Sequence, residues 1–329
     1  MKIVSAVMHT RVVKALALAI VLSAAFSGKS FAATDWSAIQ GALNATGNVF
    51  PGNVLRFELV RQDLSVTWNG AAIPTNQVSA VANGFISFKP VYGDHFFVDG
   101  ALPALETELP ALQTALRQNT HIHITAVVNH ATLETPKLLW VHFEAITRDG
   151  AGLATDLATA LATIHSPQLH ILAVIGTNTV FDPSILPPKF LKLFEEGTVE
   201  QLNSTFAFYL PRPDEKHLSV DNVKGQAALG VGHSFYIKFP FSGGTDVTLN
   251  LELAVRSAEI QDVEDTLRAG GFTVTAQNSH FLNDNPHLYF IHAYGSGDGF
   301  TLGNTLYNAI QIIQAYADIE NGHGHDHDD

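Results

Sequence analysis

Apolar and polar positions alternate along two separate stretches of this chain, and each alternation gives way to positions with helical spacing. In the first stretch, the alternation between Val54 and Val98, interrupted by turn residues, predicts strands joined by hairpins. Leu109, Leu112 and Leu116 then have the spacing of one helix face. The further elements expected here are a short helix over 35–43, strands at 121–127 and 138–143, and a closing helix over 153–164.

The second stretch repeats this order after an interruption. Residues 165–188 are rich in proline and break both periodicities, so they predict a linker. An amphipathic helix is expected near Phe190. The elements that follow are strands within 199–247, a helix over about 258–267, strands at 272–276 and 288–292, and a helix over 302–316.

One segment occurs twice without a gap, first as Thr125 to His142 and again as Thr275 to His292. Thr, Ala, His, Pro, Leu and His recur in register. Arg61 matches Arg212, and Glu108 matches Glu259; both pairs are 151 positions apart (212 minus 61, and 259 minus 108). After the helix that contains Leu109 and Leu116, matching residues are 150 positions apart. Such a regular correspondence indicates that the chain contains two copies of one unit.

The order of elements within each copy predicts the fold class. Helices mixed with strands on short turns favour an α+β protein of two tandem homologous units with largely antiparallel sheets, related by a pseudo-two-fold axis. The boundaries expected are a signal peptide over 1–32, a first unit over 33–165, a linker over 166–189, a second unit over 190–318 and a disordered tail over 319–329.

The N-terminus and the composition restrict location and partners. A basic start, an apolar run over 15–26 and a small-residue site before Ala33 predict a Sec-type signal peptide, so we expect a periplasmic or secreted protein without a membrane anchor after cleavage. The formal net charge is -13, which disfavours nucleic acid as a partner. The chain has no cysteine, which excludes thiolate chemistry.

Several short motifs together resemble one family. They are Arg61 to Asp63, the Glu-Leu-Pro at 108–110, the Thr-Ala-x-x-Asn-His at 125–130, the Glu-x-Pro at 134–136, and His142. In this combination the chain resembles the LppY/LpqO family, domain of unknown function 1259. The resemblance covers nearly the whole mature chain and implies a two-unit fold and export, but no established activity.

The chain departs from the pattern of that family at its central motif. The resemblance implies a His-Asn-His, whose first histidine is replaced here by Val128 in one copy and Asn278 in the other. If the family's histidines form a metal site, both copies here have lost one ligand.

The remaining histidines still form pairs if each motif is a hairpin. With a turn centred on Pro136, His130 lies opposite His142, and Glu144 lies opposite Val128. Directly opposed residues have Cβ atoms about 4.5 to 5.5 Å apart. Two imidazoles at that separation, with a carboxylate beside them, have the composition of zinc or non-haem iron sites.

The same arithmetic in the second copy pairs His280 with His292, with weaker candidates for a third ligand. The expected cofactor of such sites is Zn or another divalent transition metal, and the expected partner is a metal ion or a small molecule. The alternative is that the histidines only hydrogen-bond to each other or to the backbone. Both interpretations stay open at this point.

Two glutamates are candidate general bases, Glu134 beside the motif and Glu108 at the start of a helix. Glu108 is also explained by its favourable interaction with the helix dipole, and Arg61 with Asp63 by a fold-stabilising ion pair.

The C-terminal residues have their own metal-binding composition. His323, His325 and His327 alternate with glycine and aspartate, and bind Zn²⁺, Ni²⁺ or Cu²⁺ at least loosely. The alternative is a solubilising tail.

Three functions fit these observations. The first is an exported protein that binds a metal ion or small ligand through its histidine pairs. The second is a metal-dependent hydrolase or lyase, and the third is a degenerate structural or interaction protein. No nucleotide-binding loop, HExxH motif or serine nucleophile elbow occurs in the sequence.

Overall fold

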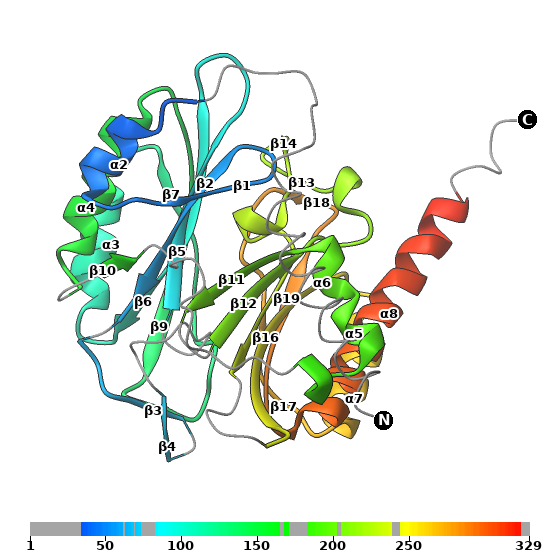
Figure 1. Cartoon of the computed structure of the whole chain (residues 1–329). Helices are drawn as coiled ribbons and strands as arrows, with labels where there is room; N and C mark the ends of the chain where they lie inside the picture. The colour runs from blue at the N-terminus through cyan, green and yellow to red at the C-terminus, as the bar shows by residue number, and fades with distance from the viewer. Residues whose placement is uncertain are drawn as a thin grey trace, which may run out of the picture. The chain divides into compact units, whose positions relative to one another are not determined.

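Antiparallel strands form one large sheet in each half of the chain (Figure 1). The computed structural model describes residues 34–61, 63–68, 70–73, 83–164, 168–170, 183–202, 205–238 and 244–323. The predicted signal peptide, most of the predicted linker, and His325 and His327 of the tail lie outside the described residues.

The first repeat contains one large sheet with the strand order β1-β2-β5-β6-β9-β7, and β10 also pairs with β2. Its strands are β1 (Asn48–Phe50), β2 (Val54–Val60), β5 (Asn83–Pro90), β6 (Phe96–Leu105), β7 (Ile122–Val128), β9 (Leu138–Thr147) and β10 (Gln168–His170). All the neighbouring pairs are antiparallel. β10 falls inside the predicted linker and extends this sheet.

The second repeat has the same sheet in the same order, β11-β12-β15-β16-β19-β17. Its strands are β11 (Thr198–Leu202), β12 (Thr205–Leu210), β15 (His233–Lys238), β16 (Asp246–Val255), β17 (Thr273–Asn278) and β19 (Tyr289–Asp298). The expected α+β architecture of two tandem, largely antiparallel units is therefore confirmed.

A small three-stranded sheet accompanies each large one. The first is β4-β3-β8, made of β4 (Ala71–Ile73), β3 (Val66–Trp68) and β8 (Glu134–Thr135), and the second is β14-β13-β18, made of β14 (Val223–Lys224), β13 (Ser219–Val220) and β18 (Asp284–Asn285). In both repeats the short strand β8 or β18 interrupts the path between the two strands that carry the histidine motif. This interruption determines where the histidines lie.

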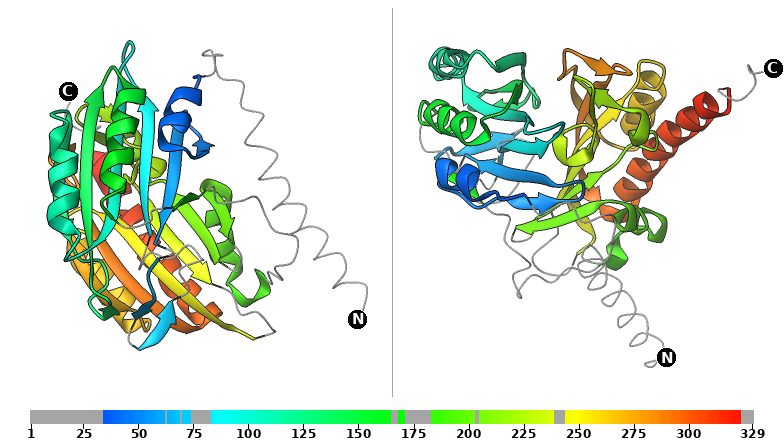
Figure 2. Two further views of the ribbon diagram at one scale, coloured as in Figure 1. Left: turned by 90° about the vertical axis from the view of Figure 1, so that its left-hand side faces the viewer. Right: turned by 90° about the horizontal axis from the view of Figure 1, so that it is seen from above.

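The helices of each repeat lie on one face of its own sheet (Figure 1 and Figure 2). The first repeat has α2 (Ser37–Leu43), α3 (Leu109–Gln118) and α4 (Gly150–Leu161), and the second has α5 (Pro188–Leu191), α6 (Leu193–Glu196), α7 (Ile260–Ala269) and α8 (Gly299–His323). Three short 3-10 turns, Pro183–Ile185, Glu215–His217 and Ala227–Leu229, complete the elements described. The last helix is longer than predicted, because it begins at Gly299 and continues to His323.

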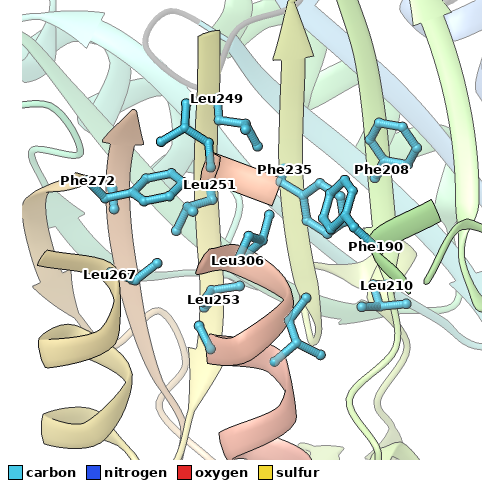
Figure 3. Close-up of a cluster of buried hydrophobic side chains, with 14 of the residues drawn as sticks. Phe190, Phe208, Leu210, Phe235, Leu249, Leu251, Leu253, Leu267, Phe272 and Leu306 are labelled. Carbon is cyan, nitrogen blue, oxygen red and sulfur yellow. The ribbon is translucent and has the colours of Figure 1, made fainter. Parts of the chain in front are cut away.

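The central strands are buried on both faces. In β2, Leu55, Phe57 and Leu59 pack under the helices of the first repeat, and the second repeat has an equivalent core between its sheet and α7 and α8 (Figure 3). The alternate β2 positions Arg56 and Glu58 are only 4% and 3% exposed. Polar residues that alternation alone would place in water are therefore covered by the other repeat.

A third apolar cluster joins the two repeats. It combines residues of the first repeat, such as Phe50 and Phe97, with residues of the second, such as Tyr209, Leu229 and Phe290. Burial of this apolar surface stabilises the contact between the two sheets.

A buried arginine links strand, turn and helix at the same place in each repeat. Arg61 is fully buried, donates from Nη1 and Nη2 to the Glu108 carboxylate at 2.9 and 3.0 Å, and from Nε to Asp63 at 2.9 Å. Arg212 makes the equivalent bonds to Glu259 and Asp214. The prediction that Arg61 and Asp63 form an ion pair is confirmed.

No helix among the described residues has the length and apolar character needed to cross a membrane.

Glu108→Ala is expected to lower the free energy of unfolding by about 3 to 5 kcal/mol, because it leaves a buried guanidinium without one of its two carboxylate partners. Glu106→Ala is the matched control, since Glu106 is 62% exposed and its bond to Lys137 lies at the surface. That substitution should change stability by less than about 1 kcal/mol. Urea unfolding measures both; equal effects would contradict the assignment.

His233 gives a prediction with a definite pH dependence. It is 1% exposed, neither ring nitrogen has a partner among the described residues, and burial together with the nearby Arg212 charge lowers its pKa to about 3. The folded protein therefore keeps this ring neutral where the unfolded chain protonates it. The stability that depends on the neutral ring is present above pH 6.5 and is lost as the pH falls toward 3, by about 1.4 kcal/mol per pH unit.

His233→Leu removes this titration and the two unpartnered nitrogens. The variant should be at least as stable as the parent at pH 7, and its advantage should grow between pH 6.5 and pH 4.5. Urea unfolding at pH 7.0, 5.5 and 4.5 measures this, with the exposed His121→Leu as control. A constant difference between variant and parent would refute the prediction.

Candidate metal centre

The four histidines of the two motifs come together in one cluster between the repeats. His130 stacks on His292 with ring centroids 3.9 Å apart, and His142 stacks on His280 at the same distance. Each stack therefore joins one repeat to the other. The Nε2 atoms of His130 and His142 are 3.1 Å apart, so one donates to the other. The sequence predicted two separate pairs, and the structure merges them into a single group.

The surroundings of the cluster also follow the repeat. His130 stacks on Trp140 with centroids 4.3 Å apart and planes at 14°, and His280 stacks on Phe290 at 3.9 Å and 5°. Trp140 and Phe290 are equivalent residues, 150 positions apart. The aromatic neighbours fix the ring planes, so the imidazole nitrogens have defined directions.

A bulge in the strand before each motif places a threonine at the boundary between the repeats. The pairing of β17 with β19 shifts between Val274 and Ala276, which leaves Thr275 as the extra residue. The Thr275 hydroxyl, buried, lies 2.6 Å from the carbonyl of His130 in the other repeat and donates to it. The pairing of β7 with β9 shifts at the equivalent Thr125. The bulge at Thr275 thus holds the histidine loop of the first repeat.

The predicted hairpin register is wrong in both copies. The structure pairs Ala126 with His142 and Val128 with Trp140, so His130 lies beyond the end of β7 rather than opposite His142. In the second copy Ala276 pairs with His292. The reason is that the chain leaves the large sheet after Val128 and forms β8, whose Glu134 and Thr135 pair with β3, before it returns as β9.

Glu252 completes the cluster, although the sequence analysis did not identify it. One ligand atom from each of His130, Glu252, His280 and His292 lies within 4.8 Å of the others, so this group could hold a metal ion. Glu252 lies directly opposite His292 in the β16–β19 pair, and its Oε2 is 3.7 Å from His292 Nδ1. Its equivalent in the first repeat is Ala101, so comparison of the copies gave no signal for it.

Burial keeps the histidines neutral. Desolvation lowers the pKa of His142 and of His292 to about 3, and it lowers the pKa values of His130 and His280 well below the ordinary range, with the neighbouring rings adding to the effect. Neutral imidazole is the form that binds metals. The same burial raises the pKa of Glu252 to about 8, against the opposing charge of Arg56.

Two nitrogens of the cluster lack partners. His280 Nε2 and His292 Nε2 are buried and accept or donate no hydrogen bond among the described residues. A buried polar atom without a partner is unfavourable by about 1 to 3 kcal/mol. Metal coordination would satisfy such atoms, and imidazole with carboxylate suits first-row divalent ions. The residues present therefore fit a metal of this class.

The other predicted ligand, Glu144, lies elsewhere. It is opposite Asp99 on β6 and His123 on β7, not opposite Val128. Burial, with the charges of Asp221 and Asp284, raises the pKa of Glu144 to about 8, and burial likewise raises the pKa of Asp99. Glu144 is therefore a buried carboxyl beside a second one and is outside the four-residue group.

The two predicted general bases belong to hydrogen-bond networks. Glu108 is bound by Arg61 and by the backbone N–H of Leu105 at 2.8 Å. The Glu134 carboxylate accepts from Asn129 Nδ2 and from the N–H of Leu138, so it closes the loop that carries His130. Neither residue lines the cavity beside the cluster. Of the predicted tail ligands, His323 lies at the end of α8.

A cavity of about 40 Å³ adjoins the cluster. It is reached by His130, His142, His292 and Glu252, while its other walls come from strands and loops of both repeats. Arg56 supplies a guanidinium to these walls. The site therefore combines metal-ligand side chains with adjoining space.

Thr275→Val should destabilise the protein by about 1 to 3 kcal/mol, because the buried His130 carbonyl loses its donor. Thr273→Val is the control, since Thr273 lies on the same strand and is exposed. Urea unfolding of the two variants, at neutral pH and without metal, compares them. The contact has no structural role if both substitutions are equally neutral.

Comparison with known proteins adds a family but no activity. No curated protein matches the chain. Among solved structures, EtuB from Clostridium kluyveri is 8% identical with a TM-score of 0.23, covering 83% of this chain and 92% of that one. A double-ringed trimeric shell protein from the RMM microcompartment is 11% identical with a TM-score of 0.16, covering 67% and 84%. Neither likeness is close enough to bear on function.

The family match is more extensive. The model of a domain of unknown function, DUF1259, matches residues 37–163 and again residues 192–312. The two matches correspond to the two repeats of the structure and include every residue of the histidine cluster. The chain therefore belongs to the DUF1259 family and carries two copies of its domain in tandem.

Proposed function

We propose that this is an exported metal-binding protein that holds one divalent first-row transition ion between its two repeats. The observation that carries the proposal is the convergence of His130, Glu252, His280 and His292, with ligand atoms within 4.8 Å of one another. Ligand atoms bound tetrahedrally to one ion at about 2.0 to 2.2 Å lie about 3.3 to 3.6 Å apart, so the four side chains would draw closer together on binding. The signal-like N-terminus supports the exported location.

His142 has a supporting role in this proposal. Its Nε2 is 3.1 Å from that of His130, and its ring stacks on His280. It therefore orients two of the proposed ligands, or replaces one of them as the side chains adjust to the ion. The partners of metal-binding histidines typically affect affinity 10- to 100-fold.

The cavity favours a second candidate function, a metal-dependent hydrolase or lyase. Three of the proposed ligands line the cavity, so a small substrate would have access to the ion. A metal ion there would supply Lewis-acid chemistry. The purely structural interpretation is less well supported, since hydrogen bonds between the rings leave His280 Nε2 and His292 Nε2 without partners.

Metal analysis of untagged mature protein tests the proposal. His323, His325 and His327 are first replaced by Ser, so that the tail contributes no metal. This parent should contain close to one equivalent of a transition metal after incubation with Zn²⁺ and gel filtration. His130→Ala/His280→Ala should lower the affinity by about 100-fold or more, because it removes two ligands.

The matched control is His121→Ala/His123→Ala, which removes two exposed histidines from the same strand region. It should retain the metal of the parent. Circular dichroism shows that each variant is folded. The proposal fails if the tail-substituted parent binds no Zn²⁺, Fe²⁺, Mn²⁺ or Co²⁺, or if the cluster variant binds metal as well as the control does.

A further inference from the structure

The cavity beside the cluster lies between equivalent strands of the two repeats. Its walls contain matched pairs of residues, related by 151 positions before the central helix and by 150 after it. These pairs are Asn83 with Ser234, Phe85 with Tyr236, Ala101 with Glu252, and His142 with His292. The cavity therefore lies where a pseudo-two-fold axis between the repeats would pass. Equivalent positions of the two repeats form its opposite walls.

The charged groups of the cavity wall stand at positions where the two copies differ. Arg56 lines it, while the equivalent residue in the second repeat is Ala207. Glu252 stands where the first repeat has Ala101, and Tyr236 where the first has Phe85. Divergence after duplication has thus placed a cation on one wall and a carboxylate on the other.

Arg56 is held in one orientation. Its Nε donates to Glu58 Oε1 at 2.5 Å, and its Nη1 donates to the Ala228 carbonyl at 3.1 Å. The guanidinium also lies over the rings of Phe85, at 3.8 Å, and Tyr209, at 4.7 Å. These contacts leave Nη2 as the guanidinium nitrogen that no described residue engages. Arg56 thus presents a fixed, charged donor from the cavity wall.

A metal ion bound by the cluster would lie beside the same cavity that Arg56 lines. The cavity would then have two positively charged groups at its walls. A bound anion would interact favourably with both of them.

We propose that this cavity binds a compact oxyanion, a carboxylate, carbonate or phosphate group, between the metal ion and Arg56. This rests on the proposed metal site and adds the class of its ligand. A volume of about 40 Å³ corresponds to about three water molecules, since each needs about 10 to 15 Å³. A cavity of this volume can hold one small anionic group. A guanidinium is well suited to bind the oxygens of such groups.

The test uses the mature chain with His323, His325 and His327 replaced by Ser, loaded with Co²⁺, whose visible spectrum reports the coordination of the ion. Acetate, bicarbonate and inorganic phosphate are titrated separately, with acetamide as the uncharged analogue of acetate. At least one anion should change the spectrum with saturation at millimolar concentration or below, and acetamide should not. The anion that binds most tightly shows whether the cavity prefers a carboxylate, a carbonate or a phosphate group.

Arg56→Met/Glu58→Gln removes the cavity cation together with its buried counter-charge, so that no unpaired charge is left. This variant should bind Co²⁺ within about threefold of the parent and the anion at least tenfold more weakly. Arg148→Met, which removes a 72% exposed cation, should behave like the parent. If the double variant does not fold, Arg56→Lys keeps the charge balance but removes the planar donor, and its anion affinity should also fall about tenfold.

The possible failures are distinct. A parent that takes up no Co²⁺ overturns the metal site and the anion site together. A stoichiometric Co²⁺ protein that responds to none of the three anions, or an anion affinity that is unchanged by the Arg56 substitutions, overturns the anion site and leaves the metal site intact.

Discussion

The contact between His130 and the second repeat is the interaction on which the site depends. The ring of His130 stacks on His292, and its carbonyl accepts from Thr275 at 2.6 Å. The loop around His130 lies outside the large sheet, so strand pairing does not hold it. Its position is therefore set by the other copy, and the cluster exists only where the two copies pack together.

The polar side chains between the repeats lower the stability of the folded protein, but they also provide groups that a ligand can bind. Four imidazoles, several carboxyls and Arg56 are buried among apolar residues, and atoms such as His280 Nε2 have no partner. An apolar interface of the same size would be more stable, because each unpartnered buried atom is unfavourable by about 1 to 3 kcal/mol. The apolar cluster around Phe290 and Tyr209 offsets this and keeps the polar groups out of water. A ligand that satisfies these atoms would stabilise the folded protein by its own binding free energy.

The sequence predicted the parts of the structure that depend on local periodicity and on the repeat. Helix α3 begins at Leu109 and α7 begins at Ile260, 151 positions later, which is the spacing of the repeat. Glu108 and Glu259 precede these helices, as expected. The register of the motif could not be predicted in this way. A tight hairpin at Pro136 is the simplest path between two strands, but the chain instead forms β8, which pairs with the distant β3. Glu252 was missed for a related reason, since nothing local connects it to a histidine 40 positions later in the sequence.

Fusion of the copies in one chain makes the asymmetry of the cavity possible. In a symmetric dimer of identical units, every residue near the two-fold axis occurs twice at equivalent places. Two Arg56 side chains would then approach each other across the cavity, and two carboxylates at the position of Glu252 would flank the histidines, with each pair repelling. Tandem duplication removes this requirement, because Ala207 and Ala101 occupy the matching positions. One cation and one carboxylate can then lie on opposite walls beside a shared histidine cluster, and neither copy alone contains that arrangement.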